Sequence, residues 1–525
     1  MAILSFEHPI FIIICFACIA ISIFNFQVLD KPKIALLFLV LASISIFTFS
    51  ALLDPFLNIW DEQFHALVAK NLSKHPALPT LIDNPIIPYD YKNWVGNYIW
   101  FHKQPLFLWQ IALSLKIFGI TELAVRIPSI IMMSIMPLFI YKIGKISVNK
   151  NAGFYGALLF CTANYTHELV SGFSNTDHND VAFLFYVTAS IWAWIEFEHS
   201  QKNYWLFLIG LFSGCAILVK WLVGLLVFAG WGISIISDKE KRSSLLPYKQ
   251  LFLSLIICLI IFVPWQLYII NFFPLESSYE YSFNAKHFVT ALEGHGGDGW
   301  YYFDNLRKIY GGGQLVPFII LISLIFFYKF IKANAIRVAL FINIFIVYIF
   351  FSLAATKMIS FCFLVSPLIF LSIATLITVF LSFIREKLLK FRVVQHLIIV
   401  SLLIMFTWMN FDLYNTACKH TMIKPDENDK RAEKINDVLF IKTLKDKLPS
   451  EDYVIFNCKP FRNISIMFYT NFIAYDFPLS YNNYLILKAR KTKLAVIDNE
   501  RLPDYLLNDS AIVKVRAPDL TWLNH

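Results

Sequence analysis

The sequence predicts an all-α polytopic membrane protein with a small α/β domain at its C-terminus. Of the 525 residues, 58% are hydrophobic and only 15% are charged, and the mean hydropathy is +0.61. Ordinary soluble domains carry about 25% charged residues, so this composition excludes a soluble globular protein. Phe alone contributes 52 residues, more than a compact soluble core needs, and we expect many of these rings to face lipid tails.

About twelve apolar stretches are long enough to cross a bilayer, because a spanning helix needs roughly 20 apolar residues. The stretch 205–237 exceeds one span, and its break at Lys220-Trp221 predicts a turn at the membrane surface. We expect the spans at 9–26, 34–53, 126–143, 152–170, 181–197, 205–219, 222–237, 251–270, 314–331, 336–354, 359–381 and 394–413.

Short basic loops predict the orientation of these spans. The positive-inside rule makes the side that carries them cytoplasmic, and the net charge of +9 reflects this topology rather than a nucleic-acid partner. The loops 54–125 and 271–313 and the tail then lie outside. The basic residues of the cytoplasmic loops are Lys31, Lys33, Lys142, Lys145, Lys150, Lys239, Lys241, Arg242, Lys249, Lys329, Lys332, Arg337, Arg385, Lys387, Lys390 and Arg392.

Two domains are predicted, a transmembrane domain at 1–413 and a soluble extracytoplasmic α/β domain at 414–525. The tail is polar, with a helical pattern near 428–447 and short strand patterns at 453–457 and 494–498. Within the loop 54–125, the stretches 61–74 and 105–118 have the pattern of amphipathic helices that lie along a membrane surface. In an extracytoplasmic tail, Cys418 and Cys458 could form a disulfide.

Acidic residues open two helices on the outer side of the predicted topology. Asp61-Glu62 directly follows the second span, and Asp177 and Asp180 precede the fifth. Carboxylates at this depth are costly unless they face a cavity, a partner or a polar substrate, so both positions are candidate sites. The alternative for Asp61-Glu62 is a pair of solvated loop acids. Helix length after the second acidic position favours Asp180 over Asp177.

Four cations lie on the same predicted side as these acids. Lys103 precedes a helix that begins with a proline, Arg126 begins the third span, Lys220 lies at the break and Lys357 follows the tenth span. The alternatives are a Lys220 that snorkels at the interface and an Arg126 that anchors a helix end.

The loop 271–313 combines glycines with polar and aromatic residues. The glycines suggest a mobile segment, and the polar groups would suit a lid over a sugar or phosphate. The alternative is an ordinary solvated loop. The candidate lid residues are His287, Glu293, His295 and Tyr301.

In their order along the chain, these motifs resemble those of the polyprenyl-phosphate-sugar glycosyltransferases of the GT-C superfamily, near the lipid A aminoarabinose transferase and the protein O-mannosyltransferases. The resemblance covers roughly residues 50–410. It departs from the family at His102, at Gln104 and at Met358-Ile359-Ser360-Phe361, which puts the sugar specificity in doubt more than the reaction. The matching motifs are Asp61-Glu62, Lys103-Gln104-Pro105-Leu106 with Trp109, Lys116-Ile117-Phe118-Gly119, Arg126-Ile127-Pro128-Ser129, Asp180, Lys220 and Lys357.

The resemblance implies transfer of a hexose or pentose from a polyprenyl-phosphate carrier to an extracytoplasmic acceptor, with inversion at the anomeric carbon. Asp61 would take the acceptor proton with Glu62 assisting, and Asp180 would be the second catalytic acid. Cations would stabilise the departing phosphate. The predicted phosphate ligands are Lys103 and Lys357 first, then Arg126 and Lys220.

No cofactor is certain from the sequence. A divalent metal ion is a candidate, because Asp61, Asp177, His178 and Asp180 offer suitable ligands. The predicted acceptor is lipid A or another envelope glycan, and the predicted location is the bacterial inner membrane with the site on the extracytoplasmic side. Two alternatives are a protein O-mannosyltransferase-like enzyme and a lipid-linked sugar flippase or transporter. A transporter usually places its charges near the midplane and shows internal repeats, whereas these charges lie at one surface.

Overall fold

A computed structural model describes residues 8–173, 177–311, 313–387, 396–397, 400–401, 425–498 and 502–516. The chain divides into two compact units. Unit 1 comprises Met1–Leu52 and Ser129–Thr416, and unit 2 comprises Leu53–Pro128 and Ala417–His525. The long loop after the second helix is thus part of the same compact unit as the C-terminal region. The predicted domain boundary at 413 stays a prediction.

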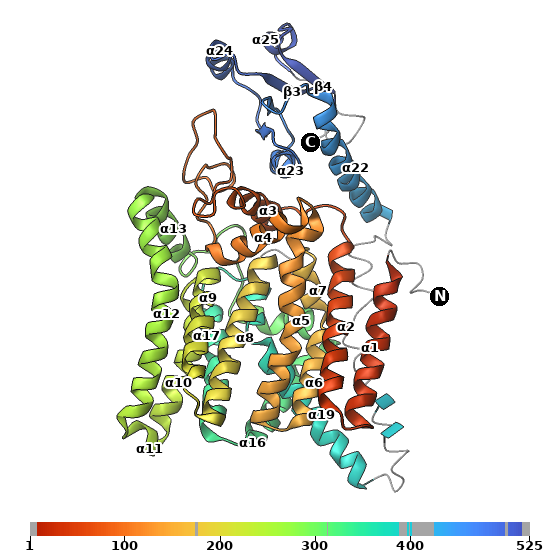
Figure 1. Cartoon of the computed structure of the whole chain (residues 1–525), viewed down its shortest axis with the longest axis vertical. Coiled ribbons are helices and arrows are strands. Elements are labelled where there is room, and N and C mark those ends of the chain that lie inside the picture. The colour runs from red at the N-terminus through yellow and green to blue at the C-terminus, as the bar shows by residue number, and fades with distance from the viewer. Residues whose placement is uncertain are drawn as a thin grey trace. The chain divides into compact units, whose positions relative to one another are not determined.

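Unit 1 is a bundle of long apolar helices, several of which run side by side in Figure 1. Its helices are α1 (Pro9–Gln27), α2 (Pro32–Leu52), α5 (Glu122–Ser147, which begins in unit 2), α6 (Lys150–Cys161), α7 (Asn164–Val170), α8 (Asp177–Ser200), α9 (Tyr204–Lys220), η2 (Trp221–Leu225), α10 (Leu226–Ser237), α11 (Lys239–Arg242), α12 (Leu245–Phe272), α13 (Pro274–Lys286), α14 (Tyr301–Asp304), α15 (Leu306–Tyr310), η3 (Gly313–Leu315), α16 (Val316–Phe330), α17 (Asn334–Leu353), α18 (Ile359–Phe363) and α19 (Ser366–Lys387).

The all-α membrane fold is confirmed. Within the described residues, nine stretches are long and apolar enough to cross a membrane, with α9 through α10 counted once. Two predicted spans are wrong as single helices. In 152–170, α6 ends at Cys161 and α7 begins at Asn164; in 359–381, α18 ends at Phe363 and α19 begins at Ser366. The Thr162 hydroxyl donates to the Leu158 carbonyl at 3.2 Å, a local bond that competes with the helical pattern. The predicted span 394–413 lies mostly outside the described residues.

The predicted break at Lys220-Trp221 is confirmed. Helix α9 ends at Lys220, and Trp221 has a positive φ of 57° before a short 3-10 turn. Lys241, just beyond α10, forms an ion pair of 2.6 Å with Glu198, just before α9. The start of α9 and the end of α10 therefore lie close together, and the two helices form a hairpin instead of one continuous helix.

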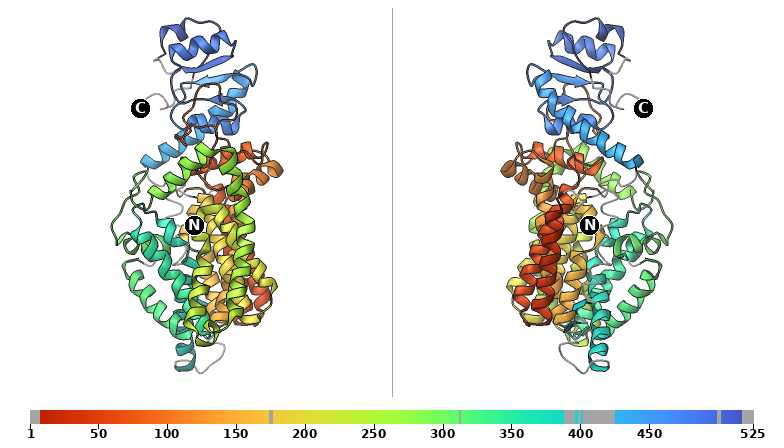
Figure 2. Two further views of the ribbon diagram at one scale, coloured as in Figure 1. Left: turned by 90° about the vertical axis from the view of Figure 1, so that its left-hand side faces the viewer. Right: turned by 90° about the vertical axis from the view of Figure 1, so that its right-hand side faces the viewer.

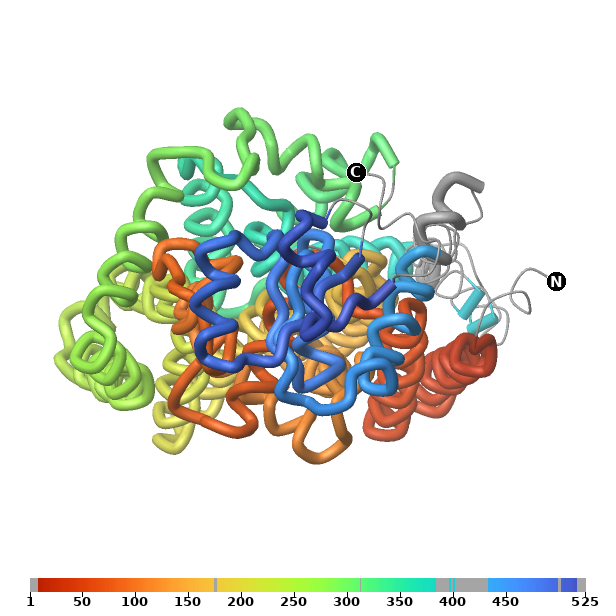
Figure 3. Tube along the Cα trace, turned by 90° about the horizontal axis from the view of Figure 1, so that it is seen from above, coloured from red at the N-terminus to blue at the C-terminus, as the bar shows by residue number. Residues whose placement is uncertain are grey.

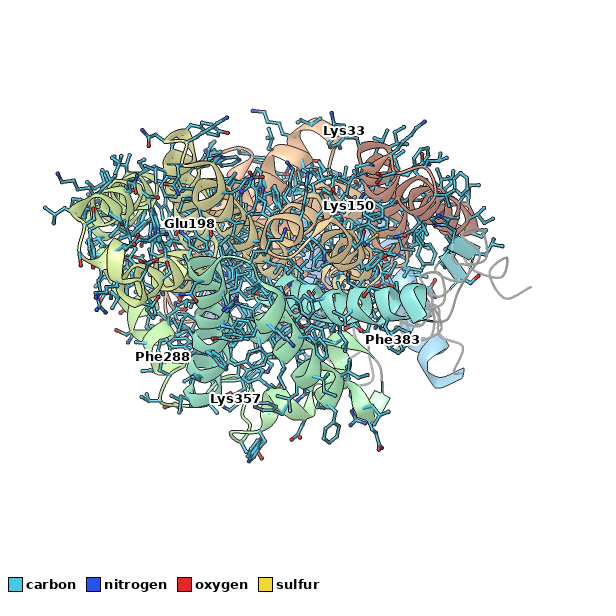
Figure 4. The ribbon with its side chains drawn as sticks, turned by 90° about the horizontal axis from the view of Figure 1, so that it is seen from below. Lys33, Lys150, Glu198, Phe288, Lys357 and Phe383 are labelled. Carbon is cyan, nitrogen blue, oxygen red and sulfur yellow. The ribbon has the colours of Figure 1, made fainter. Side chains whose placement is uncertain are left out.

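The basic loops of unit 1 lie at the same end of the bundle. Lys150 pairs with Asp30 at 2.6 Å, which joins the start of α6 to the turn between α1 and α2. The Lys332 amide donates to the Ser147 carbonyl at 3.0 Å, which joins the loop before α17 to the end of α5. Figure 4 looks at this end of unit 1 from below and labels Lys33 and Lys150 there. The clustering is what the positive-inside argument requires.

Small and hydroxylated residues bring the helices of unit 1 close together. A Cβ built on Gly144 would lie 2.5 Å from the Cα atom of Gly153, so the two glycines allow α5 and α6 to approach closely. The Ser22 hydroxyl donates to the Ala35 carbonyl at 2.7 Å across α1 and α2, which run side by side in the right-hand view of Figure 2. Such contacts hold helices together in lipid, where apolar burial alone does not.

Unit 2 contains the predicted α/β region, whose strands (blue in Figure 3) form one parallel sheet in the order β2-β1-β3-β4. The patterns at 453–457 and 494–498 are confirmed as strands, and two further short strands complete the sheet. The elements are α3 (Asp61–Leu72), α4 (Pro105–Phe118), α22 (Pro425–Lys447), β1 (Val454–Phe456), α23 (Arg462–Tyr469), β2 (Ile473–Ala474), α24 (Tyr481–Ala489), β3 (Leu494–Asp498), α25 (Asp504–Leu507) and β4 (Val513–Arg516).

The two helices predicted in the loop 54–125 are present as α3 and α4. Every residue of α3 after Asp61 is buried, so α3 is not the amphipathic surface helix that the pattern suggested. Inside unit 2 it packs against α4 and α23. Cys458, which follows β1, is a buried free thiol, and Cys418, its predicted disulfide partner, lies outside the described residues.

Candidate active site

Asp61 is the first residue of α3, and the structure brings Lys103 close to it. The Lys103 ammonium lies 3.7 Å from a carboxylate oxygen of Asp61, and the two side chains are 19% and 16% exposed. Pro105 begins α4 two residues after Lys103, as expected for a residue with a fixed φ and no amide hydrogen. The starts of α3 and α4 therefore hold a carboxylate and an ammonium together, and both remain accessible.

Glu62, the next residue, has the opposite environment. Its carboxylate pairs with Arg126 at 2.7 Å, and both side chains are completely buried. The guanidinium also donates to the carbonyls of Asp54 and Phe56, at 2.6 and 2.7 Å. The Asn58 amide donates to Glu62 at 2.6 Å. This pair joins the start of α3, the loop before it and the first turn of α5.

Aromatic rings surround the accessible pair. Trp60 directly precedes Asp61, is 44% exposed and has a positive φ of 71°, a backbone strain of about 1–3 kcal/mol for a bulky residue. Its ring lies 4.6 Å from that of Phe461, measured between centroids. Trp94 stacks on His102 at 4.4 Å, with the rings nearly parallel. The residues on either side of the Asp61–Lys103 pair are thus held by ring contacts.

Lys70 is a buried cation near the other end of α3. Its ammonium donates to three main-chain carbonyls, of Met467 and Phe468 at 2.7 and 2.9 Å and of Thr470, which matches the three hydrogens of an ammonium. Burial, and then the neighbouring charges of Lys74 and Lys445, lower the pKa of Lys70 to about 7. Lys70 also lines a polar pocket of about 170 Å³ in unit 2.

In unit 1, the buried carboxylate of Asp180 forms an ion pair with Lys220, whose side chain is partly exposed. The distance between the ammonium and the carboxylate is 2.5 Å, and the ammonium also lies 4.5 Å from the ring centroid of Phe361. The next residue, Trp221, makes an edge contact with Tyr281 of α13. The turn between α9 and α10 therefore supplies a cation to the first turn of α8.

Asp177 and His178 are more deeply buried than the Asp180–Lys220 pair. The His178 ring lies 2.8 Å from the Ser129 hydroxyl of α5, and the Asp177 carboxylate accepts from the His178 amide. The geometry favours Asp180 as the second acidic position, because its carboxylate meets a predicted cation. Among the residues that the structure describes, no group of three or more His, Cys, Asp or Glu side chains is arranged to hold a metal ion.

Lys357 is buried, and its ammonium donates to carbonyls at the end of α17. The acceptors are Phe351, Ser352 and Ala354, at 3.3, 2.7 and 2.6 Å. The amide of Lys357 in turn donates to the His295 carbonyl at 2.9 Å. Lys357 therefore closes the end of α17 and is joined to the predicted lid loop.

The predicted lid segment is tied to residues 355–357 at several points. The His287 ring lies 3.0 Å from the Thr356 hydroxyl, and the Thr356 amide donates to the His287 carbonyl at 3.0 Å. Glu293 is exposed with a positive φ of 54°. Tyr301 begins α14, where burial raises the pKa of its hydroxyl. The mobility of this segment stays a prediction.

Sequence reasoning missed Lys70, Trp60 and Phe461. All three are ordinary residues in unremarkable local patterns, so no motif marks them. The contacts that matter join positions nearly 400 residues apart, as between Lys70 and Met467, and no local pattern predicts such pairings. A lysine inside a helix whose other faces are apolar, as in Leu67-Val68-Ala69-Lys70, is the one signal available.

Comparison with known proteins bears on the family and the fold. Residues 102–268 match the family model of dolichyl-phosphate-mannose-protein mannosyltransferases. ArnT from Cupriavidus metallidurans, solved with undecaprenyl phosphate, superposes with a TM-score of 0.64 and 14% identity over 92% of this chain and 93% of that one. The chain has the GT-C fold. It resembles the glycosyltransferases that use polyprenyl-phosphate sugars.

Two further matches extend the comparison. The archaeal oligosaccharyltransferase AglB from Archaeoglobus fulgidus, solved with an inhibitory peptide and a dolichol-phosphate, has a TM-score of 0.51 and 12% identity over 87% of this chain and 69% of that one. An uncharacterized protein of Aquifex aeolicus is 25% identical over 175 residues, or 33% of this chain and 32% of that protein. The AglB match shows the fold alone, and the chain spans about a third of the Aquifex aeolicus protein.

Proposed function

We propose that the protein transfers a sugar from a polyprenyl-phosphate donor to an acceptor outside the cytoplasm, with inversion at the anomeric carbon. The observation that carries the proposal is the accessible pair of Asp61 and Lys103 at the starts of α3 and α4. Both residues belong to the ordered motifs that resemble the GT-C family, and Lys103 lies inside the segment that matches the mannosyltransferase model.

Asp61 acts as the general base. The acceptor hydroxyl gives its proton to the Asp61 carboxylate and its oxygen bonds to the anomeric carbon. The bond between that carbon and the phosphate oxygen breaks, and the polyprenyl phosphate leaves with the electron pair. Proton transfer of this kind contributes about 10²–10⁴ to a rate.

Cations stabilise the negative charge of the departing phosphate. Lys103 and Lys220 are the better candidates, because each ammonium is partly exposed and pairs with a carboxylate. Lys357 remains a candidate whose ammonium would first have to leave the carbonyls at the end of α17. Asp180 would keep Lys220 in position until the donor binds.

Two predicted roles are revised in this proposal. Arg126 was expected to bind the donor phosphate, and Glu62 to assist the base. Each is completely buried and satisfied by the other and by main-chain groups. We therefore assign the Glu62–Arg126 pair to holding the start of α3 in place.

The acceptor that we favour is lipid A or another envelope glycan, at the outer face of a bacterial inner membrane. The clustering of basic loops at one end of unit 1 supports this orientation. A protein hydroxyl is the second candidate acceptor, and the family-model match to protein mannosyltransferases favours it. The sugar, a hexose or a pentose, is left to experiment.

The test is sugar transfer by the purified protein in liposomes. The assay supplies a panel of polyprenyl-phosphate sugars with lipid and peptide acceptors, and Asp61→Asn is measured beside the native protein. We expect transfer by the native protein and a loss of about 10²–10⁴-fold in the variant. Asp30→Asn is a matched control, because Asp30 is an exposed carboxylate in an ion pair.

Two outcomes would contradict the proposal. If Asp61→Asn transfers sugar at the native rate while it binds the donor, Asp61 is not the base. If folded native protein consumes no donor but carrier lipid moves between leaflets, the protein is a flippase, and the transferase proposal fails.

A further inference from the structure

The C-terminal part of unit 2 contacts α3 near its C-terminal end through Lys70. The three carbonyls that accept from the ammonium belong to the last residues of α23 and the turn after it. The last carbonyls of a helix lack partners within the helix, and a cation satisfies them and the helix dipole together. Lys70 thus binds the end of one helix to the side of another.

A second contact lies at the opposite end of α3. Phe461, just before α23, packs on Trp60 at 4.6 Å and on Phe64 at 6.3 Å between ring centroids. Phe461 and Trp60 both have positive φ values, of 65° and 71°. Two strained backbones in direct contact indicate that the surrounding structure holds each in place.

A third group of contacts lies on Glu122, the first residue of α5. The Tyr469 hydroxyl donates to the Glu122 carboxylate at 2.7 Å, and Lys442 of α22 lies 3.4 Å from the same oxygen. Helix α23 therefore touches α3 at both ends and also the segment that carries Arg126. Arg126 in turn pairs with Glu62 at the start of α3.

We infer that α23 and the residues around it form a clamp that fixes the direction of α3, with Lys70 and Phe461 as positioning residues for Asp61. The inference rests on the proposed function for the role of Asp61. In this arrangement the C-terminal α/β region is a part of the catalytic apparatus. A helix of 12 residues held at both ends cannot tilt, and its first carboxylate stays beside Lys103.

Hydrogen exchange of the purified full-length protein in detergent tests the clamp without any substrate. Lys70→Met removes the ammonium and keeps the apolar stem, and Phe461→Leu removes the ring. We expect amide exchange to rise about tenfold or more both in residues 57–66 and in 462–470. Lys74→Met is the matched control, because Lys74 lies two residues beyond the end of α3 and is exposed, and it should leave both segments unchanged.

Transfer kinetics provide the second readout. A positioning role predicts a lower kcat with little change in the KM for the donor, and partial recovery in Lys70→Arg, which keeps a cation. The clamp is refuted if Lys70→Met and Phe461→Leu speed exchange in 462–470 alone, since Lys70 then only caps α23. If both variants speed exchange in 57–66 and 462–470 as expected but the native protein transfers no sugar, the clamp stands and the proposed function is rejected.

Discussion

Asp61 and Glu62 are neighbours in sequence and in type, yet their surroundings differ completely. Asp61 shares an accessible ion pair with Lys103, and both side chains touch solvent. Glu62 shares a fully buried ion pair with Arg126, and main-chain groups take up the remaining hydrogen bonds. Because side chains one residue apart on a helix point about 100° away from each other, one acid faces solvent while the other faces the interior.

The different surroundings of the two acids suit them to different roles, one in chemistry and the other in structural support. A carboxylate that must accept a proton from a substrate needs space and access, whereas a buried ion pair is costly to form and very costly to break. An acidic pair in a sequence therefore predicts one catalytic residue and one structural residue as readily as two catalytic ones.

Breaking the buried pair should give the largest effect on stability. We expect Arg126→Met to lower the free energy of unfolding by about 3–5 kcal/mol, because it leaves the Glu62 carboxylate buried without its cation. Thermal unfolding in detergent measures the change. The double variant Glu62→Gln with Arg126→Met should recover part of the loss. Equal losses in the single and double variants would show that the carboxylate is not the cause.

The second prediction concerns Lys70, a buried cation that hydrogen-bonds to carbonyls instead of a carboxylate. The pKa of Lys70 is about 7 in the folded protein and about 10.4 in the unfolded chain. Between these two pH values, the unfolded chain therefore binds more protons than the folded protein. The stability of the native protein relative to Lys70→Met should therefore rise with pH, by about 1.4 kcal/mol per unit above pH 7, and should be flat below it.

Thermal unfolding of both proteins across pH 6–9 measures this difference. A native advantage that stays flat across pH 6–9 would mean that the carbonyls hold the ammonium in its charged form throughout this range. Lys70 would then resemble Arg126 in remaining charged although its side chain is buried.

The smallest effect is expected where the pair is accessible. Lys103→Met should change the free energy of unfolding by only about 0–1 kcal/mol, because solvent screens such pairs, although it should slow sugar transfer. The same unfolding assay as for Arg126→Met gives a direct comparison. A loss as large as that of Arg126→Met would show that the Asp61–Lys103 pair is also structural.

The sequence predicted the fold class well and the helix count less well. Apolar length identifies a span, so most spans in the described residues match their predicted ranges within a few residues. The break within 152–170 was not predictable from apolar length; it lies at Thr162, the residue that follows the end of α6. The turn at Lys220-Trp221 was predictable, because no bilayer accommodates a straight helix over 205–237.

For the candidate site, the sequence identified the residue types but not their partners. Asp61 and Lys103 were predicted to act in the same reaction, and the structure places the Lys103 ammonium 3.7 Å from the Asp61 carboxylate. The role of Arg126 could not be predicted, because burial depends on the loop at 54–58 that wraps around it. Lys70 was missed because its three acceptors come from a segment with no recognisable motif.

The contact between Lys70 and Met467 spans 397 residues of chain. At the speed of protein synthesis, that interval corresponds to on the order of half a minute. During this time α3 has left the ribosome but its clamp has not been made. Helix α3 is therefore among the first elements to be synthesised and among the last to be fixed. A chain cut short before Phe461 would keep every motif of the predicted site and the Glu62–Arg126 pair, while α3 would lack its contacts with Phe461 and with the carbonyls that bind Lys70.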